Sequence, residues 1–171
     1  MGTIEYATEQ DIGEILALYK AQLGREFCPW DDEYPGLTQI HYDLSRHSLL
    51  VMREAVASDD DGTNPKGRII AAITIDADEK VESLPYWTKA LQPGCELSRL
   101  AVAPDQQNQG LARQMILHAM DALRERGFVS VHFLVNRLNV KALRSYDKLG
   151  FATVGEVEFF DQPMLCYEKA L

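Results

Sequence analysis

The sequence predicts an α/β protein whose mixed, largely antiparallel sheet of about six to seven strands is flanked by about four helices. Short apolar runs of strand length alternate along the chain with amphipathic segments of helical spacing. A strand, a helix and a second strand follow one another between Glu96 and Val135, which predicts a parallel pair with a right-handed crossover. The length of 171 residues is typical of one domain, so we expect a single domain over residues 1–171.

The first half of the chain is expected to supply strands and two short helices. Apolar residues repeat at helical spacing after Ile12, and the segment 26–36 combines prolines, aromatic residues and acids without any period, which indicates a loop. Between the apolar runs at 48–57 and 68–76, the polar connector 58–67 favours a hairpin tip. The expected elements are a strand at 3–7, helices from Ile12 to near Gly24 and at 37–44, and strands at 48–57 and 68–76.

The second half contains the central strand and the longest helix. Residues 110–126 place apolar side chains in a wide stripe, and Gly127 is expected to end that helix. The stripe comprises Leu111, Met115, Ile116, Leu117, Met120 and Leu123. The other expected elements are a loop with one helical turn at 78–93, strands at 129–135, 152–160 and 164–169, and a short helix at 139–149.

Composition and charge exclude several classes of function. The hydrophobic fraction of 46% is that of a globular protein, so a disordered chain is excluded. With 17 basic and 26 acidic residues the net charge is −9, which argues against binding to nucleic acid or to an anionic membrane. The same charge favours a cationic substrate.

The cysteines and histidines give no sign of a metal site or of disulfide bonds. Cys28, Cys95 and Cys166 are odd in number and lack the paired spacing of zinc ligands, and Cys95 and Cys166 fall in apolar runs expected in the core. The histidines form no metal-ligand pair, so each is expected to be structural or exposed, and no metal is expected. No signal or membrane-spanning segment is recognisable, and we expect a cytoplasmic protein.

A polar loop between the central strand and the long helix has the character of an anion site. Pro104 and Asp105 end the strand, and the residues from Gln107 to Ala112 form a polar turn into the helix that includes Gly110, which lets a ligand approach the backbone. The first N–H groups of a helix have no intrahelical acceptor and lie at the positive end of its dipole, where a phosphate binds well. An ordinary strand-to-helix turn with a glycine is the alternative.

A second polar pattern lies on the short helix that follows. Asn139, Ala142 and Tyr146 are spaced three and then four residues apart, so a helix places them on one face, and Asn139 stands where it can also cap the helix. Taken alone, Tyr146 is equally compatible with a ring packed into the core.

Together the two patterns resemble the GNAT superfamily of N-acetyltransferases. The run Gln107-x-x-Gly110-x-Ala112 is similar to the acyl-CoA pyrophosphate loop of that family. The run Asn139-x-x-Ala142-x-x-x-Tyr146, followed by Leu-Gly-Phe, is similar to its later helix, and the order of the two agrees. The resemblance covers Glu96 to Phe151, and it implies the GNAT fold with a splayed central parallel pair.

The resemblance implies acetyl-CoA as cosubstrate and no metal. Backbone groups of the central strand would pair with the pantetheine amides, the loop with Arg113 would bind the pyrophosphate, and Asn139 would contact the pantetheine arm. The implied cofactor contacts are Leu100, Ala101, Val102, Gln107, Asn108, Gln109, Gly110, Leu111, Ala112, Arg113, Asn139, Ala142 and Tyr146.

The resemblance also suggests the catalytic groups. Tyr146 is the expected acid toward the thiolate of CoA, and Glu96 is the expected base for the amine, with a solvated strand-end glutamate as the alternative. The backbone N–H of Leu100 is a candidate for holding the oxyanion. No covalent enzyme intermediate is required, so direct attack in a ternary complex is expected.

The acceptor is expected to be a primary amine of a small molecule or a peptide. Trp30, Asp31 and Tyr34, in the aromatic and acidic loop, are its candidate binding residues, and an exposed acidic loop without that role is the alternative. A non-catalytic acyl-CoA-binding sensor module of the same fold is the alternative function. Transfer to a hydroxyl, use of a longer acyl chain, and assembly as a homodimer are left open.

Overall fold

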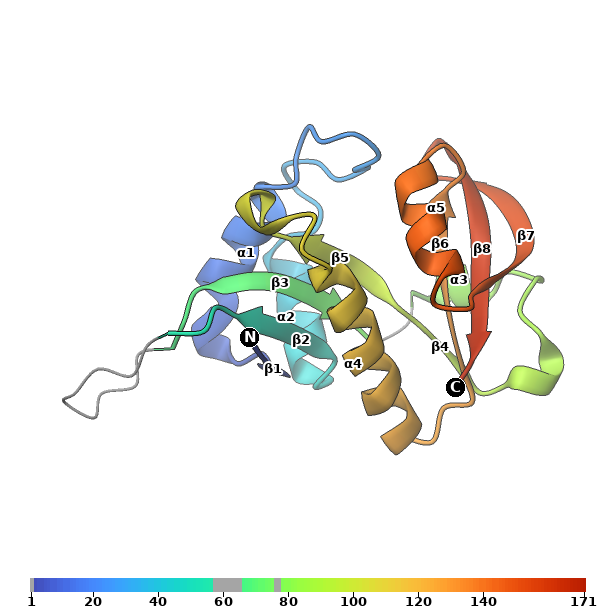
Figure 1. Cartoon of the computed structure of the whole chain (residues 1–171), viewed down its shortest axis with the longest axis horizontal. Coiled ribbons are helices and arrows are strands. Elements are labelled where there is room, and N and C mark those ends of the chain that lie inside the picture. Colours follow the sequence, from blue (N-terminus) through green and yellow to red (C-terminus); the bar gives the residue numbers. More distant parts are fainter. Residues whose placement is uncertain (1, 57–65, 76–77) are drawn as a thin grey trace. The chain divides into compact units, whose positions relative to one another are not determined.

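The computed structural model describes residues 2–56, 66–75 and 78–171 (Figure 1). The chain divides into two compact units. Unit 1 comprises Met1–Thr74 and Arg99–His118, and unit 2 comprises Ile75–Ser98 and Ala119–Leu171. The described residues form five α-helices and eight strands, which confirms the mixed α/β class. The strands form two sheets of four, so the sequence pattern underestimated their number by one or two.

Unit 1 is built on a sheet with the strand order β1-β2-β3-β5. β2 pairs antiparallel with both β1 and β3, and every residue of β2 and β3 is buried. Ile15 and Tyr19 of one helix and Ile40 of the next are also buried (Figure 1, blue and cyan). The elements are β1 (Thr3–Tyr6), η1 (Glu9–Asp11), α1 (Ile12–Lys20), α2 (Leu37–Ser45), β2 (Leu49–Arg53), β3 (Ile69–Thr74), β5 (Ser98–Val102) and η3 (Pro104–Gln106).

The strands and helices expected in the first half are confirmed, with limits that differ by a few residues. Strands β2 and β3 lie within the runs expected at 48–57 and 68–76. Most of the connector expected at 58–67 falls on residues 57–65, which lie outside the described part of the chain, as do residues 76–77.

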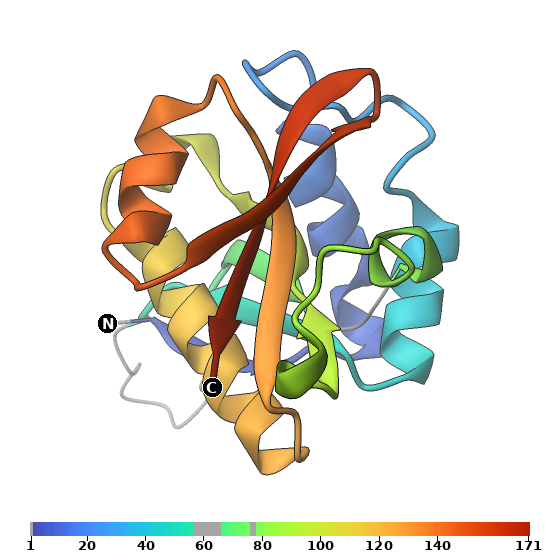
Figure 2. The same ribbon diagram turned by 90° about the vertical axis from the view of Figure 1, so that its right-hand side faces the viewer.

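Unit 2 contains the second sheet, with the strand order β4-β6-β8-β7. β4 is parallel to β6, as predicted, whereas β8 is antiparallel to both β6 and β7 (Figure 2). Val81, Trp87 and Cys166 form a buried apolar cluster. The elements are α3 (Glu79–Glu82), η2 (Lys89–Leu91), β4 (Gly94–Glu96), β6 (Ser130–Asn136), α5 (Val140–Asp147), β7 (Ala152–Phe159) and β8 (Gln162–Ala170).

The central strand expected after Glu96 is interrupted at Leu97. β4 ends at Glu96 and pairs with β6, whereas β5 begins at Ser98 and belongs to the sheet of β3. The backbone leaves the extended conformation at Arg99, whose φ of 46° lies in the left-handed region. Few non-glycine residues adopt that region, and a single such residue redirects a strand. The residue types from Glu96 to Val102 gave no sign that the expected strand is interrupted at Leu97.

The longest helix, α4 (Leu111–Glu125), follows β5, and the boundary between the two units runs through it after His118. Leu117, which was expected on the apolar stripe, is 38% exposed, so the stripe is narrower than predicted. Gly127 ends the helix with a φ of 87°, and the N–H of Phe128 donates to the carbonyl of Leu123 at 3.1 Å. The buried residues of α4 are Met115, Ile116, Ala119, Met120 and Leu123.

Both cysteines that were expected in the core are buried, Cys95 at 2% and Cys166 at 0% exposure. The third, Cys28, is half-buried, and all of them are free thiols. No helix within the described residues is both long and apolar enough to cross a bilayer.

A buried arginine connects three elements of unit 1. Arg53 at the end of β2 is 5% exposed, and its Nε donates to Glu5 Oε1 of β1 at 2.7 Å. The same guanidinium donates to Asp11 Oδ1 in η1 and to the carbonyl of Gly67. Asp11 Oδ2 in turn accepts the backbone N–H of Thr8 at 2.8 Å. Removing one member of such a group leaves a buried charge without its partner.

Acid titration of Asp11 should therefore change stability. Burial alone would raise the pKa of the Asp11 carboxyl, but hydrogen bonds from the Thr8 backbone and from Arg53 outweigh it and hold the pKa below its usual range. Because the pKa of Asp11 is lower in the folded state, its ionised carboxylate stabilises the fold at pH values above the unfolded-state pKa of about 3.9. This contribution disappears as the pH falls through the folded-state pKa.

We expect Asp11→Asn to lower the free energy of unfolding by about 3 kcal/mol at neutral pH, because Arg53 loses its buried counter-ion. The difference from wild type should shrink below about pH 4. Urea denaturation at neutral pH and below about pH 4 measures the free energy of unfolding of both proteins. The control is Glu9→Gln, which changes an exposed carboxylate of the same turn. A loss that does not depend on pH would contradict the role of the ion pair.

Candidate active site

The loop between β5 and α4 has the backbone geometry of an anion site. Asn108 and Gly110 both lie in the left-handed region, with φ values of 62° and 76°. The N–H of Gln114 donates to the carbonyl of Gly110, so the N–H groups of the first helical residues, 111–113, have no acceptor within the helix. No atom lies within 4 Å of the position that a Cβ of Gly110 would take. The loop thus presents helix N–H groups beside open space, and the side chain of Arg113 is exposed.

Gln107, the first residue of the loop pattern, is tied to the protein by its side chain. Its Nε2 donates to the carbonyl of Val102 at 3.3 Å, and its Oε1 accepts from the guanidinium of Arg25. The amide of Gln22, near the end of α1, donates to the same Val102 carbonyl at 3.1 Å. Gln107 therefore holds the loop in place, and the Val102 carbonyl already accepts from two amide side chains.

The strand that carries Leu100, Ala101 and Val102 stands last in the strand order of its sheet. Ala101 is 2% exposed, whereas its two neighbours are half-buried. One edge of β5 is thus without a strand partner in this sheet, among the residues that the structure describes. Such an edge is suited to pairing with an extended ligand that carries amides.

The predicted acceptor residues lie in the loop between α1 and α2. The ring of Trp30 packs edge-on against Tyr19, with the ring centroids 5.4 Å apart. Asp31 is exposed, and its Oδ1 accepts the backbone N–H groups of Glu33 and Tyr34, both at 2.8 Å, which hold its pKa below the usual range. Trp30 and Tyr34 of this loop are thus half-buried, whereas the carboxylates of Asp31, Asp32 and Glu33 are exposed.

Sequence reasoning missed Arg99, which anchors this loop. Its Nη2 donates to Asp43 Oδ1 at 2.6 Å, and its Nη1 donates to the hydroxyl of Tyr34 at 3.3 Å. Asp43 of α2 is fully buried and also accepts from Thr74 Oγ1 at 2.9 Å. Burial alone would lower the pKa of Arg99, but the Asp43 carboxylate outweighs it and raises that pKa. A lone arginine in an apolar strand gave no signal of these contacts.

The second motif begins α5 in unit 2. Asn139 is the N-cap, and its Oδ1 accepts the N–H of Ala142 at 3.2 Å, as the spacing predicted. The side chain of Asn139 is half-buried, and Ala142 lies one helical turn further on. The side-chain oxygen of Asn139 is therefore already used in capping.

Tyr146 combines a packed ring with an unengaged hydroxyl. Its ring meets Phe133 edge-on at a centroid distance of 4.8 Å, and Phe151 and Tyr167 at 6.4 and 6.3 Å. Within the described residues, the contacts of Tyr146 are those of its ring, whereas the hydroxyl of Tyr167 donates to Asp147. Burial raises the pKa of Tyr146 to about 12, so the phenol is neutral at physiological pH. Core packing and a role for the hydroxyl are compatible here.

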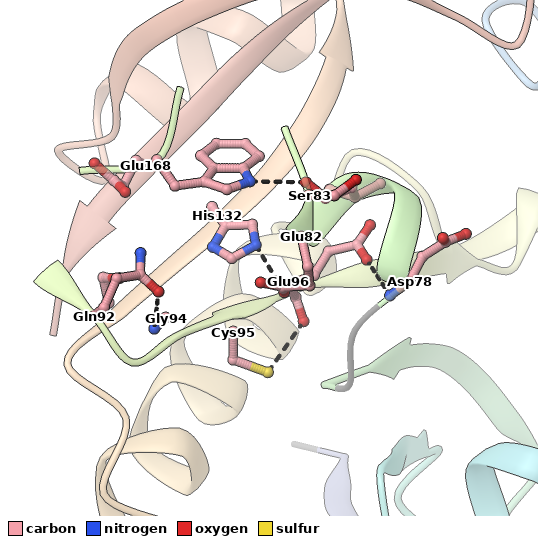
Figure 3. A network of polar contacts seen from close by, with 12 residues as sticks. Asp78, Glu82, Ser83, Gln92, Gly94, Cys95, Glu96, His132 and Glu168 are labelled. Carbon is pink, nitrogen blue, oxygen red and sulfur yellow. Dashed lines mark hydrogen bonds and ion pairs between the residues drawn. The ribbon is translucent and has the colours of Figure 1, made fainter. Parts of the chain in front are cut away.

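Glu96, the expected base, lies at the end of β4. It is 6% exposed, so the interpretation as a solvated strand-end side chain is wrong. Its Oε2 accepts the backbone N–H of Asp78 at 2.8 Å (Figure 3). The carboxylate is thus fixed inside unit 2, where proton exchange with an acceptor requires water or a relay.

Glu96 belongs to a row of buried polar side chains across unit 2. In the pairing register it lies opposite His132 of β6, which lies opposite Glu168 of β8, so these side chains share one face of the sheet (Figure 3). His132 is fully buried, and its Nε2 lies 2.9 Å from Glu82 Oε1. Glu168 accepts both the N–H and the hydroxyl of Thr88.

The sequence contained only part of the information about this row. The alternating residue types at 129–135 predicted the strand β6, which carries His132. The partner of His132, Glu82, is 50 residues away in the chain, so the sequence did not indicate their contact. The imidazole also stacks on Trp87 at a centroid distance of 4.2 Å. His132 is therefore structural, one of the two options expected for it. The described residues contain no group of three or more His, Cys, Asp or Glu that could hold a metal ion.

Comparison with known proteins gives a family and a fold. The model of the acetyltransferase (GNAT) family matches residues 14–151. Mycothiol acetyltransferase of Rhodococcus opacus (strain B4) is 36% identical over 94 residues, which are 52% of this chain and 30% of that protein. The ribosomal protein bS18-alanine N-acetyltransferase of Escherichia coli (strain K12) is 36% identical over 64 residues, 37% of this chain and 43% of that protein. The chain thus spans less than half the length of either relative.

Among solved structures, yncA from Salmonella typhimurium, determined with its cofactor acetyl-CoA, superposes with a TM-score of 0.72. The two sequences are 18% identical, and the match covers 100% of this chain and 94% of the other, so the likeness concerns the fold. The family match includes both the loop at 107–112 and the helix that begins after Asn139. The chain belongs to the acetyltransferase (GNAT) family.

Proposed function

We propose that the protein transfers an acetyl group from acetyl-CoA to a primary amine of a small molecule or a protein, by direct attack in a ternary complex. The observation that carries this proposal is the loop that leads into α4, where open space surrounds left-handed Gly110 and the N–H groups of 111–113 have no acceptor within the helix. The loop lies within the residues that match the acetyltransferase family.

The loop that leads into α4 in unit 1 is suited to binding the pyrophosphate of CoA. The N–H groups of 111–113 and the dipole of α4 favour an anion, Gly110 leaves the backbone accessible, and Arg113 adds a positive charge. Gln107 keeps the loop in this form through Arg25 and Val102. The free edge of β5 at Leu100 offers backbone groups to the pantetheine amides and to the oxyanion.

Tyr146 is proposed as the group that stabilises the departing thiolate. Its pKa of about 12 exceeds that of an ordinary thiol, about 8.5, so complete proton transfer from the phenol would be uphill by roughly 5 kcal/mol. A hydrogen bond from the neutral phenol to the sulfur has no such cost. The hydroxyl is available for it, because the contacts of Tyr146 with the described residues are made by its ring.

Glu96 is proposed as the base for the ammonium form of the acceptor. An alkylammonium must lose a proton before it attacks, since its pKa is about 10. Glu96 is 6% exposed, so it would receive that proton through an ordered water. Its contact with the Asp78 N–H fixes the orientation of the carboxylate.

The acceptor is proposed to bind along the loop between α1 and α2. Asp31 and its acidic neighbours Asp32 and Glu33 are exposed there, which favours a cationic amine. One relative is named for acetylating an alanine of a ribosomal protein, so a peptide amine is one acceptor of this class.

We expect purified protein with acetyl-CoA to release free thiol in the presence of at least one amine from a panel of polyamines, amino acids, aminoglycosides and peptide N-termini. Gly110→Glu should abolish CoA binding in calorimetry, because it puts a side chain and a negative charge into the open space of the loop. Gly110→Ala is the control, in which the left-handed backbone costs only about 1 kcal/mol.

Retained affinity in Gly110→Glu would refute this phosphate site. Tight CoA binding without thiol release over the whole panel would identify a non-catalytic acyl-CoA-binding module instead. Thiol release with hydroxyl compounds alone would place the activity among O-acyltransferases.

Tyr146→Phe should lower kcat by roughly tenfold to a thousandfold and leave the Kd of acetyl-CoA unchanged, because the ring packing persists and only the hydroxyl is lost. Stopped-time thiol release and calorimetry measure the two quantities. Tyr167→Phe, which removes a hydroxyl already bonded to Asp147, is the matched control. Equal turnover in wild type and Tyr146→Phe at saturating substrates would exclude the phenol from the reaction.

A further inference from the structure

We propose that Arg25, in the turn that follows α1, is a second guanidinium ligand of the CoA pyrophosphate and acts together with the loop that leads into α4. This inference rests on the proposed function and adds to it a cofactor contact from a part of the chain far from the loop motif.

The local structure holds Arg25 against the loop. Its backbone N–H donates to the carbonyl of Gln22 at 3.2 Å, and its own carbonyl accepts the N–H of Cys28 at 3.1 Å, so the turn is fixed at both ends. Its Nη2 donates to Oε1 of Gln107, the residue with which the phosphate loop begins. The guanidinium is half-buried and lies at the loop without any intervening element.

Among the described residues, no carboxylate balances the charge on Arg25. Its side chain contacts a neutral amide, although the chain as a whole has 26 acidic residues against 17 basic ones. Other arginines of unit 1 have carboxylate partners: Arg53 with Glu5 and Asp11, Arg68 with Glu54 and Asp105, and Arg99 with Asp43.

An unbalanced guanidinium beside helix N–H groups that have no acceptor within the helix is suited to an anion. Gln107 engages one N–H of Arg25, and a guanidinium has further donors in a planar fork that matches phosphate oxygens. Arg113 lies in the first turn of α4, at the other end of the loop. The two arginines would therefore approach a bound diphosphate from the two ends of the segment 107–113.

A purely structural role for Arg25 gives different expectations. If its contact with Gln107 only holds the loop, a neutral amide at position 25 that keeps this hydrogen bond should suffice. The ligand with phosphates and the ligand without them would then be affected equally. A direct contact makes affinity depend on the charge at position 25 and on the presence of the pyrophosphate.

The test compares Arg25→Gln, which keeps an amide donor, with Arg25→Lys, which keeps the charge. Arg46→Met removes an arginine charge elsewhere in unit 1, where the guanidinium lies over the ring of Tyr42, and is the matched control. Calorimetry measures CoA and 3′-dephospho-CoA, and ligand-observed NMR titration measures pantetheine. Circular dichroism verifies that each variant is folded.

We expect Arg25→Gln to weaken both CoA and 3′-dephospho-CoA by roughly tenfold or more, with Arg25→Lys recovering part of the loss and pantetheine unaffected. Arg46→Met should bind as wild type does. Unchanged CoA affinity in Arg25→Gln, or an equal loss for pantetheine, would overturn the inference. If only CoA were weakened and 3′-dephospho-CoA were not, the pyrophosphate assignment would also fail. Failure of the wild-type protein to bind CoA would refute the proposed function instead.

Discussion

The arrangement of unit 1 depends on the ion pair between Arg99 of β5 and Asp43 of α2. Arg99, the second residue of β5, has a left-handed backbone, and its half-buried guanidinium is held by the Asp43 carboxylate at 2.6 Å. A strained residue persists where its surroundings over-determine it. β5 is the last strand of its sheet, and η3 separates it from the loop that leads into α4. The same guanidinium reaches Tyr34, so the loop between α1 and α2 is anchored to this point.

Unit 2 is organised around the polar row formed by Glu96, His132 and Glu168. Buried carboxylates are costly unless they are hydrogen-bonded, and here the segment 78–88 supplies the partners. The Asp78 N–H thereby fixes the carboxylate of Glu96, which stands opposite His132 in the parallel pairing of β4 with β6. A base held in this way is well oriented but poorly exposed, which is why its proposed action passes through water.

The sequence was most informative where the determinants are local. The glycine before α4, the cap at Asn139 and the end of α4 at Gly127 each depend on residues within one or two helical turns, and each is found as predicted. The contacts that sequence reasoning missed join distant residues: Arg25 meets Gln107 across 82 positions, and Arg99 meets Asp43 across 56. Such pairs follow from the completed fold and leave no periodic pattern in the chain. The roles of the candidate site residues remain predictions for the same reason.

The anchoring of Gln107 also has a kinetic consequence. Its contacts with Arg25 and Val102 order the loop in the free protein, so a ligand would meet a loop that is already formed and would not have to select a rare conformer. The encounter rate would then be governed by electrostatics. An anionic ligand approaching a protein of net charge −9 is repelled at long range and attracted by guanidinium groups only within a Debye length of about 10 Å at 0.1 M salt. Moderate ionic strength screens the long-range repulsion by the net charge more than the short-range attraction by the guanidinium groups. It would therefore speed the association of an anionic ligand.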